Sequence, residues 1–157
     1  MRAAVLVVNS KIASGSEPDI DRDKISQLVA GLPAELVTYD VVHDDRKAIR
    51  EQLVRLCDER DARLVLTLGG TGVRPTDWTP EATRDVIEKE IPGIGEAMRQ
   101  ESLKKVRTAM LSRGTAGIRG RSLIVNVPGS FDGVKENLAV IQPILEHTVE
   151  KIGKGKA

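Results

Sequence analysis

The chain has 157 residues, a formal net charge of +1 and 40% hydrophobic residues, a composition typical of one globular domain. Aromatic residues make up only 2%, and 24 basic residues balance 23 acidic ones. Base-stacking modules need aromatic platforms and phosphate backbones attract excess basic charge, so we expect no nucleic-acid partner. No segment approaches the roughly 20 apolar residues of a membrane span, and the single cysteine, Cys57, excludes a disulfide framework. We therefore expect a cytoplasmic protein with no membrane partner.

The first part of the chain alternates strands with a loop and a helix. Residues 3–8 are a continuous apolar run, typical of a strand buried on both faces. Residues 9–21 are polar and contain glycine and proline, which predicts a loop. A short amphipathic helix follows, and residues 35–42 are predicted to form a second strand. A second amphipathic helix then begins after two adjacent aspartates.

The middle of the chain predicts two more buried strands, at residues 64–68 and 123–127, each of which runs into a glycine-containing turn. Between them a Thr-Pro pair provides an N-cap and a first helical proline, so a helix is predicted over residues 79–91. Residues 95–112 have a mostly helical composition. Strands that alternate with helices predict an α/β fold with a largely parallel sheet covered on both faces.

The end of the chain repeats apolar residues at alternating spacings of four and three, which predicts a long amphipathic helix to residue 152. Pro143 lies inside it and is expected to bend it. Residues 153–157 are predicted to be a frayed basic tail, which leaves a single domain over residues 1–152.

Ligands of parallel sheets bind beyond the carboxyl ends of the strands, so the turns at those ends are the candidate site. The strongest local signal is Gly69-Gly70-Thr71-Gly72, because successive backbone N–H groups in a glycine-rich turn can bind an anion. It matches neither the P-loop nor the dinucleotide-binding pattern. The alternative interpretation is a tight strand-to-helix turn that binds nothing.

Three aspartates could act at such a site. Asp77 is a natural Mg²⁺ ligand if phosphates occupy the turn, but it could equally be a charge that complements the helix dipole. One of Asp44 and Asp45 is expected to cap the following helix, and the other could point into the crevice toward Asp77.

Ser112, Arg113 and the turn Pro128-Gly129-Ser130 offer hydroxyls, backbone donors and a guanidinium, all suited to phosphate. The turn could also be an ordinary one without a ligand. The residues alone therefore predict a phosphate or nucleotide site without naming its ligand.

Several motifs in this order resemble the MogA/MoaB family of molybdopterin-binding proteins. They are Thr67-Leu68-Gly69-Gly70-Thr71-Gly72, Asp77, Thr79-Pro80-Glu81-Ala82-Thr83, Pro92-Gly93, Met110-Leu111-Ser112-Arg113 and Asn126-Val127-Pro128-Gly129-Ser130. The resemblance runs from the first predicted strand to the last predicted helix.

The resemblance implies a three-layer α/β/α sandwich and a molybdopterin adenylyltransferase of molybdenum cofactor biosynthesis, with Mg²⁺, ATP and molybdopterin bound. By position, Asp45 and Asp77 would be the catalytic carboxylates and Mg²⁺ ligands. The implied binding residues are Ser10, Gly69, Gly70, Thr71, Gly72, Glu81, Ser112, Arg113, Pro128, Gly129 and Ser130. A homotrimer or hexamer is implied as well, with possible handover to a molybdate-inserting partner protein.

The chain departs from the family pattern after the first strand, where Asn9-Ser10 stand in place of the usual Ser-Asp. This change keeps two alternatives open. The protein could hold molybdopterin or a nucleotide without catalysis, as a carrier or assembly subunit, or it could be a purely oligomeric scaffold.

Overall fold

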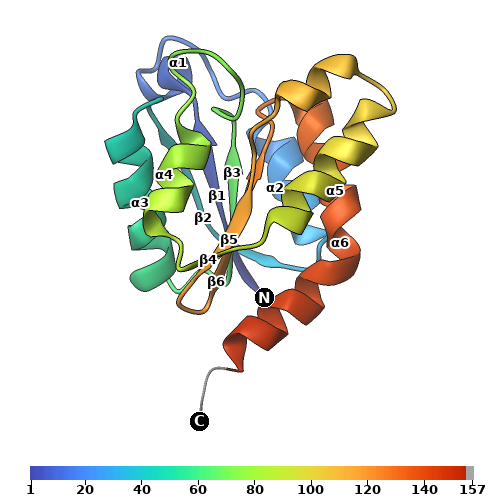
Figure 1. Ribbon diagram of the computed structural model, residues 1–157. Helices are drawn as coiled ribbons and strands as arrows, with labels where there is room; N and C mark the ends of the chain where they lie inside the picture. The colour runs from blue at the N-terminus through green and yellow to red at the C-terminus, as the bar shows by residue number, and fades with distance from the viewer. Residues whose placement is uncertain (155–157) are drawn as a thin grey trace.

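The computed structural model describes residues 1–154, and it places helices on both faces of one six-stranded sheet (Figure 1). The strands are β1 (Arg2–Val8), β2 (Glu35–Val42), β3 (Leu64–Leu68), β4 (Lys89–Glu90), β5 (Ala116–Arg119) and β6 (Ser122–Val127). Their order across the sheet is β2-β1-β3-β6-β5-β4. β2, β1, β3 and β6 are parallel, whereas β5 is antiparallel to both of its neighbours. The predicted three-layer α/β fold with a mostly parallel sheet is confirmed.

The helices divide between the two faces of the sheet. They are α1 (Ser10–Ala13), α2 (Arg22–Ala30), α3 (Arg46–Asp58), α4 (Thr79–Val86), α5 (Pro92–Leu103), the 3₁₀ helix η1 (Arg107–Leu111) and α6 (Phe131–Gly153). One core cluster joins the sheet to α2, α5 and α6, and a second joins it to α3 and α4. Figure 1 shows the same division, with α3 and α4 on the left and α2, α5 and α6 on the right.

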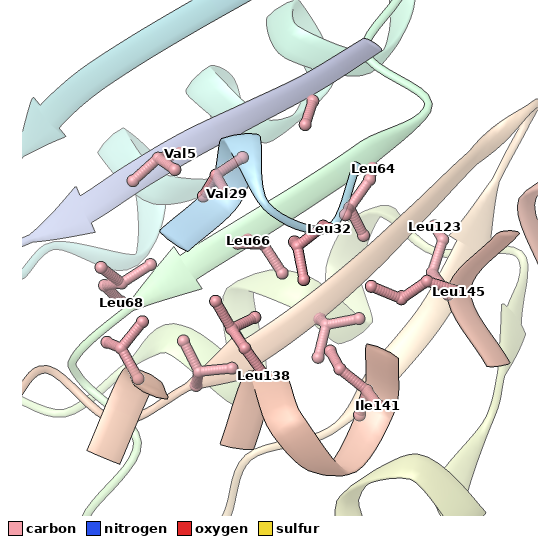
Figure 2. Packing of buried hydrophobic residues seen from close by; sticks show 14 of the residues in the cluster. Val5, Val29, Leu32, Leu64, Leu66, Leu68, Leu123, Leu138, Ile141 and Leu145 are labelled. Atoms are coloured by element: carbon pink, nitrogen blue, oxygen red, sulfur yellow. The ribbon is translucent and has the colours of Figure 1, made fainter. Parts of the chain in front are cut away.

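The central strands β1, β3 and β6 are mostly apolar because both of their faces are covered. Along β1, Val5 belongs to the first core cluster and its neighbour Leu6 to the second, since successive side chains of a strand point to opposite faces. Figure 2 shows the first cluster, in which Leu123 of the sheet lies beside Leu145 of α6. The continuous apolar runs therefore predicted these buried strands correctly.

One buried polar group joins the sheet to α4. Asn126 of β6 is only 1% exposed, and its Nδ2 donates to Thr67 Oγ1 and to Thr83 Oγ1, each at 2.9 Å. Its Oδ1 accepts from the backbone N–H of Thr115. Buried polar groups need such partners, and these bonds pin β3, β6 and α4 together near the carboxyl ends of the two strands.

The region after β3 corrects the predicted helices. The helix expected over residues 79–91 ends at Val86, and the two-residue strand β4 follows it. Pro92 begins α5 rather than marking a break, because a proline is tolerated in the first turn of a helix. The mostly helical segment expected over residues 95–112 is divided between α5 and η1.

Smaller corrections concern helix ends. Trp78, not Thr79, occupies the N-cap position of α4, and the Thr79 hydroxyl donates instead to Gly69 O at 2.8 Å. The predicted loop over residues 9–21 contains α1, capped by the side chain of Asn9. Helix α6 continues through Pro143 and includes Gly153, the first residue of the expected tail, whose residues 155–157 lie outside the described part. Within residues 1–154, no helix combines the length and the apolar character needed to cross a bilayer.

Candidate functional site

A cleft of about 800 Å³ lies beyond the carboxyl ends of β1, β3 and β6. Its lining comes from three turns, one after each strand, from one side chain that follows β2 and from one residue of η1. The lining residues are 8–11, Glu17, Asp44, 69–74, Thr76, Asp77, Leu111 and 128–130. The cleft therefore lies where the strand pattern predicted a ligand site.

The turn after β3 has a backbone shape that requires glycine. Gly69 and Gly70 have φ angles of +100° and +68°, which side chains strongly disfavour. A Cβ atom on Gly69 would lie 2.7 Å from Val8 O, and one on Gly70 would overlap the Thr79 hydroxyl. The N–H of Thr79 also donates to Gly70 O at 3.1 Å. The turn is therefore packed tightly between β1 and the start of α4.

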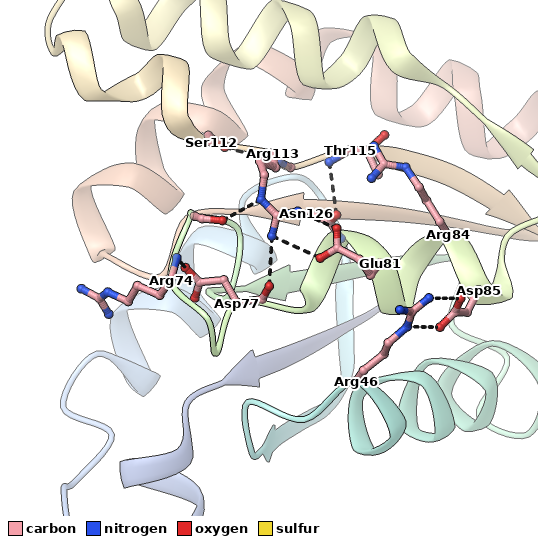
Figure 3. Close-up of polar contacts among 12 residues, drawn as sticks. Arg46, Arg74, Asp77, Glu81, Arg84, Asp85, Ser112, Arg113, Thr115 and Asn126 are labelled. Atoms are coloured by element: carbon pink, nitrogen blue, oxygen red, sulfur yellow. Dashed lines mark hydrogen bonds and ion pairs between the residues drawn. The ribbon is translucent and has the colours of Figure 1, made fainter.

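Arg113 holds the rest of this loop through hydrogen bonds to its backbone carbonyls. Its Nε donates to Gly72 O at 2.7 Å, its Nη2 donates to Asp77 O at 3.0 Å, and its backbone N–H donates to Thr71 O at 2.7 Å. The guanidinium also pairs with both carboxylate oxygens of Glu81, on α4 (Figure 3). This bidentate pair holds the pKa of Glu81 below its ordinary value. Glu81 and Arg113, expected as ligand contacts, are not among the residues that line the cleft.

Asp77 is on the cleft side of the loop. Its Oδ2 accepts from the backbone N–H of Arg74 at 2.9 Å, and the same oxygen lies 2.9 Å from the position of a Cβ on Gly72. Asp77 lines the cleft and is half-buried. The loop therefore presents one carboxylate, in a fixed position, beside the glycine turn.

The two adjacent aspartates after β2 make different contacts. Asp45 is the N-cap of α3, where its Oδ2 accepts from the N–H of Ala48 at 2.8 Å. Asp44 lines the cleft, and its Oδ2 accepts from both the N–H and the hydroxyl of Ser10, at 3.0 and 3.1 Å. Asp44 is therefore the one of the two that lines the cleft, whereas the resemblance implied a role for Asp45, which stays a prediction.

Some of the remaining predicted site residues line the cleft, and Ser112 does not. Ser10 and the turn of residues 128–130 line the cleft, and the Ser130 hydroxyl also caps α6 by accepting from Gly133 N–H. Ser112 instead borders a separate cavity of about 60 Å³ under α5. The carbonyls of Ser112 and Gly114 accept from Arg99 of α5, which anchors this segment to the helix.

Two cationic residues of the cleft were not predicted. Lys11 lines one wall, 3.6 Å from Glu17 across an exposed ion pair. Arg74 lines the opposite wall, and in Figure 3 its guanidinium points away from the Arg113 cluster. Both lie in turns that the sequence had marked, so a search for basic residues in those turns would have found them.

The cleft contains few groups that could bind a metal ion. Among the described residues, no cluster of three or more His, Cys, Asp and Glu side chains is placed to do so. Asp44 and Asp77 are the two aspartates of the lining. Such a pair suits Mg²⁺, which commonly binds one or two carboxylates and takes its other ligands from phosphate and water.

Comparisons with known proteins identify the family. The profile described as a probable molybdopterin binding domain matches residues 4–147. Molybdopterin adenylyltransferase from Helicobacter pylori is 40% identical over 151 residues, covering 94% of this chain and 85% of that protein. The enzyme of the same name from Escherichia coli is 40% identical over 141 residues, covering 88% and 72%.

Solved structures agree. The molybdopterin biosynthesis enzyme MoaB from Thermus thermophilus superposes with a TM-score of 0.90 at 40% identity, over 98% of this chain and 97% of that one. MoaB from Pyrococcus furiosus, described as a tungsten cofactor synthesizing protein, gives a TM-score of 0.84 at 31% identity, over 98% and 97%. With its profile match, its relatives and its fold in agreement, the chain belongs to the MogA/MoaB family of molybdopterin-binding proteins.

Proposed function

We propose that this protein is a molybdopterin adenylyltransferase of molybdenum cofactor biosynthesis. The observation that carries the proposal is the cleft at the carboxyl ends of β1, β3 and β6, which is lined by a glycine turn and by the carboxylates of Asp44 and Asp77. Two relatives 40% identical to this chain bear that enzyme name. A cytoplasmic location accords with ATP as the substrate.

In the proposed reaction, the terminal phosphate of molybdopterin attacks the α-phosphorus of ATP. One P–O bond forms to molybdopterin, and the bond from the α-phosphorus to the bridging oxygen breaks. Pyrophosphate leaves with the electron pair of that bond. Neither reacting group requires a protein nucleophile, so we expect catalysis to come from positioning and charge neutralisation.

The residues of the cleft have properties suited to that task. The Gly69 N–H donates to Val127 O, but the N–H groups of Gly70, Thr71 and Gly72 and those of the first turn of α6 can donate to phosphate oxygens. Lys11 and Arg74 bring positive charge to opposite walls. Asp44 and Asp77 would hold Mg²⁺, for which each has an oxygen besides the Oδ2 used in the hydrogen bonds described above. Bound Mg²⁺ would neutralise the phosphates and orient the leaving pyrophosphate.

The test is to incubate the purified protein with molybdopterin and Mg-ATP and to look for adenylylated molybdopterin by mass spectrometry. We expect product from the wild type and at least a 100-fold lower rate from Asp77→Asn, on the order of the loss of one preorganised electrostatic group. Asp77 lies in a loop, so the free energy of unfolding of the variant should lie within about 0.5 kcal/mol of the wild-type value. Normal turnover by the folded variant would exclude the role proposed for Asp77.

A second candidate function is non-catalytic binding of molybdopterin, favoured by the altered turn at Asn9 and Ser10. Asn9 caps α1 and Ser10 binds Asp44, so both replacements have structural roles in the wall of the cleft. Retained molybdopterin without adenylylated product would establish the carrier function. Failure to retain either substrate would support an oligomeric scaffold.

We also propose that the protein forms a homo-oligomer, a trimer or a hexamer, and transfers its product to a molybdate-inserting partner. Val106 and Met110, near α5, are 53% and 64% exposed and give this face an apolar character suited to a subunit contact. Light scattering after gel filtration would measure the mass, and a monomer at micromolar concentration would contradict the oligomer.

A further inference from the structure

We infer that Arg113 and Glu81 are positioning residues, which act on the reaction through the loop that carries Asp77 rather than by touching substrate. The inference rests on the proposed function for its kinetic consequence. Its structural part, that Arg113 sets the shape of residues 72–77, can be tested independently.

The hydrogen bonds of the guanidinium support this role. Nε donates to the carbonyl of Gly72 and Nη2 to the carbonyl of Asp77, so one rigid plane fixes the two ends of the loop. The pair with Glu81 ties that plane to the first turn of α4. In Figure 3 the guanidinium lies between Asp77 and Glu81. Four of the five guanidinium N–H donors thus bind protein acceptors, and Arg113 does not line the cleft.

The position of the Asp77 carboxylate depends on these two anchors. Its Oδ2 accepts from Arg74 N–H, inside the loop, and packs against Gly72, whose carbonyl Arg113 holds. A shift of either end would therefore move the carboxylate relative to the cleft. Misplacement by about 1 Å can cost on the order of 100-fold in rate.

Arg113→Lys is the informative substitution. Lysine keeps the positive charge, but it is a point charge on a flexible stem and cannot bind several acceptors in one plane. Asp77 would keep its chemistry and lose its fixed position. We therefore expect kcat to fall by about 10- to 100-fold and the Mg²⁺ concentration for half-maximal rate to rise, while KM for molybdopterin changes by less than about twofold.

Trp78 provides a readout that does not depend on activity. It is the only tryptophan of the chain, it directly follows Asp77, and it is 39% exposed. Its emission maximum and its quenching by acrylamide should change in Arg113→Lys and also in Glu81→Gln, because both substitutions release the same loop.

The control is Arg119→Lys. Arg119 has a similar network, with a bidentate pair to Asp58 and a bond to Val86 O, at the end of β5 remote from the cleft. It should lower the unfolding midpoint about as much as Arg113→Lys does, but leave Trp78 emission, kcat and the Mg²⁺ dependence unchanged.

The outcomes separate the two proposals. Unchanged Trp78 emission and quenching in folded Arg113→Lys would overturn the inference, as would a KM for molybdopterin or ATP that rises with no fall in kcat. A wild type that makes no product would overturn the adenylyltransferase, while the fluorescence of the variants would still decide whether Arg113 positions the loop.

Discussion

The two walls of the cleft are held in different ways. The loop of residues 69–77 is tied to distant parts of the chain, since it receives hydrogen bonds from the Arg113 side chain and backbone and from Thr79. Its shape is therefore a tertiary property. A change in this wall should be transmitted to Asp77.

The opposite wall, residues 9–21, is held mostly by its own bonds. The Asn9 side chain accepts from two N–H groups of α1, and the hydroxyls of Ser14 and Ser16 donate to the carbonyl of Lys11. The polar side-chain contacts of this wall with other elements join Ser10 to Asp44 and Asp19 to Tyr39. Ile12 also packs against the first core cluster, and the Asn9 N–H donates to Val42 O. The departures from the family pattern lie in this wall, where local bonds can adapt to a change of sequence.

The largest effect should come from Asp44, which bonds Ser10 of the second wall and is one of the two aspartates proposed to hold Mg²⁺. We expect Asp44→Asn to lower the rate of product formation by at least about 100-fold, because a charge that neutralises Mg²⁺ is removed. Asp45→Asn is the matched control, since asparagine caps a helix as well as aspartate does. Rates measured by mass spectrometry decide between them. Equal losses in both variants would restore the role that the resemblance implied for Asp45.

A pair of glycine substitutions compares the stability of the two walls directly. Gly70→Ala should lower the free energy of unfolding by about 2–4 kcal/mol, because the new Cβ overlaps Thr79 and φ is positive. Gly15 also has positive φ, +82°, but nothing lies within 4 Å of its Cβ position. Gly15→Ala should therefore cost only about 1–2 kcal/mol. Urea unfolding measures both, and equal costs would show that packing does not distinguish the walls.

Low pH should destabilise the first wall, residues 69–77, more than the second wall, residues 9–21. The hydrogen bond from Arg113 lowers the pKa of Glu81 in the folded protein. The associated stability is complete above the unfolded-state pKa of about 4.3 and is lost as the pH falls through the lower, folded-state value. Glu81→Gln should thus cost about 1 kcal/mol at pH 7 and progressively less below pH ~4.

Glu17→Gln in the second wall is the control for this titration. Its ion pair with Lys11 is exposed, so the substitution should change the free energy of unfolding by less than about 1 kcal/mol at pH 7. Urea midpoints at several pH values would measure both variants. A cost of Glu81→Gln that stays constant down to pH 3 would contradict the assignment.

The smallest effect concerns Cys57, which lies in α3, outside both walls. It is 8% exposed, and burial raises the pKa of its thiol to about 11. We expect a thiol reagent at pH 8 to label the native protein far more slowly than the urea-unfolded chain. The rate of Cys57 labelling in the two glycine variants then measures global unfolding, separately from any local change in the two walls. Rapid labelling of the native wild type would show that α3 opens locally.

The sequence predicted the buried part of the fold well and its edge poorly. β1, β3 and β6 are buried and mostly apolar, which makes them recognisable as continuous runs. β4 has only two residues, both exposed, and β5 has four residues with a glycine at the second position, so neither has a strand pattern of its own. β5 pairs with β6 and β4 pairs with β5, and no local sequence pattern reveals this pairing.

The candidate site likewise has features that the sequence predicted and features that it could not predict. Glycine turns after buried strands could be predicted to form one cleft, because parallel strands end on the same side. Which of two adjacent aspartates caps α3 could not be predicted, since both satisfy the preference for a capping residue. The roles of Glu81 and Arg113 depend on a contact across 32 positions of the chain, and residue types alone do not specify it.

The reversed direction of β5 has a consequence for the route of the chain. In a wholly parallel sheet, the residues that precede a strand lie at its amino end, on the side remote from the ligand. Because β5 runs against β6, the segment before it begins on the cleft side, and this places Arg113 against the loop that carries Asp77. Because of this one antiparallel strand, the segment that leads into β5 supports the cleft. The other residues of the cleft come mostly from segments that follow the parallel strands.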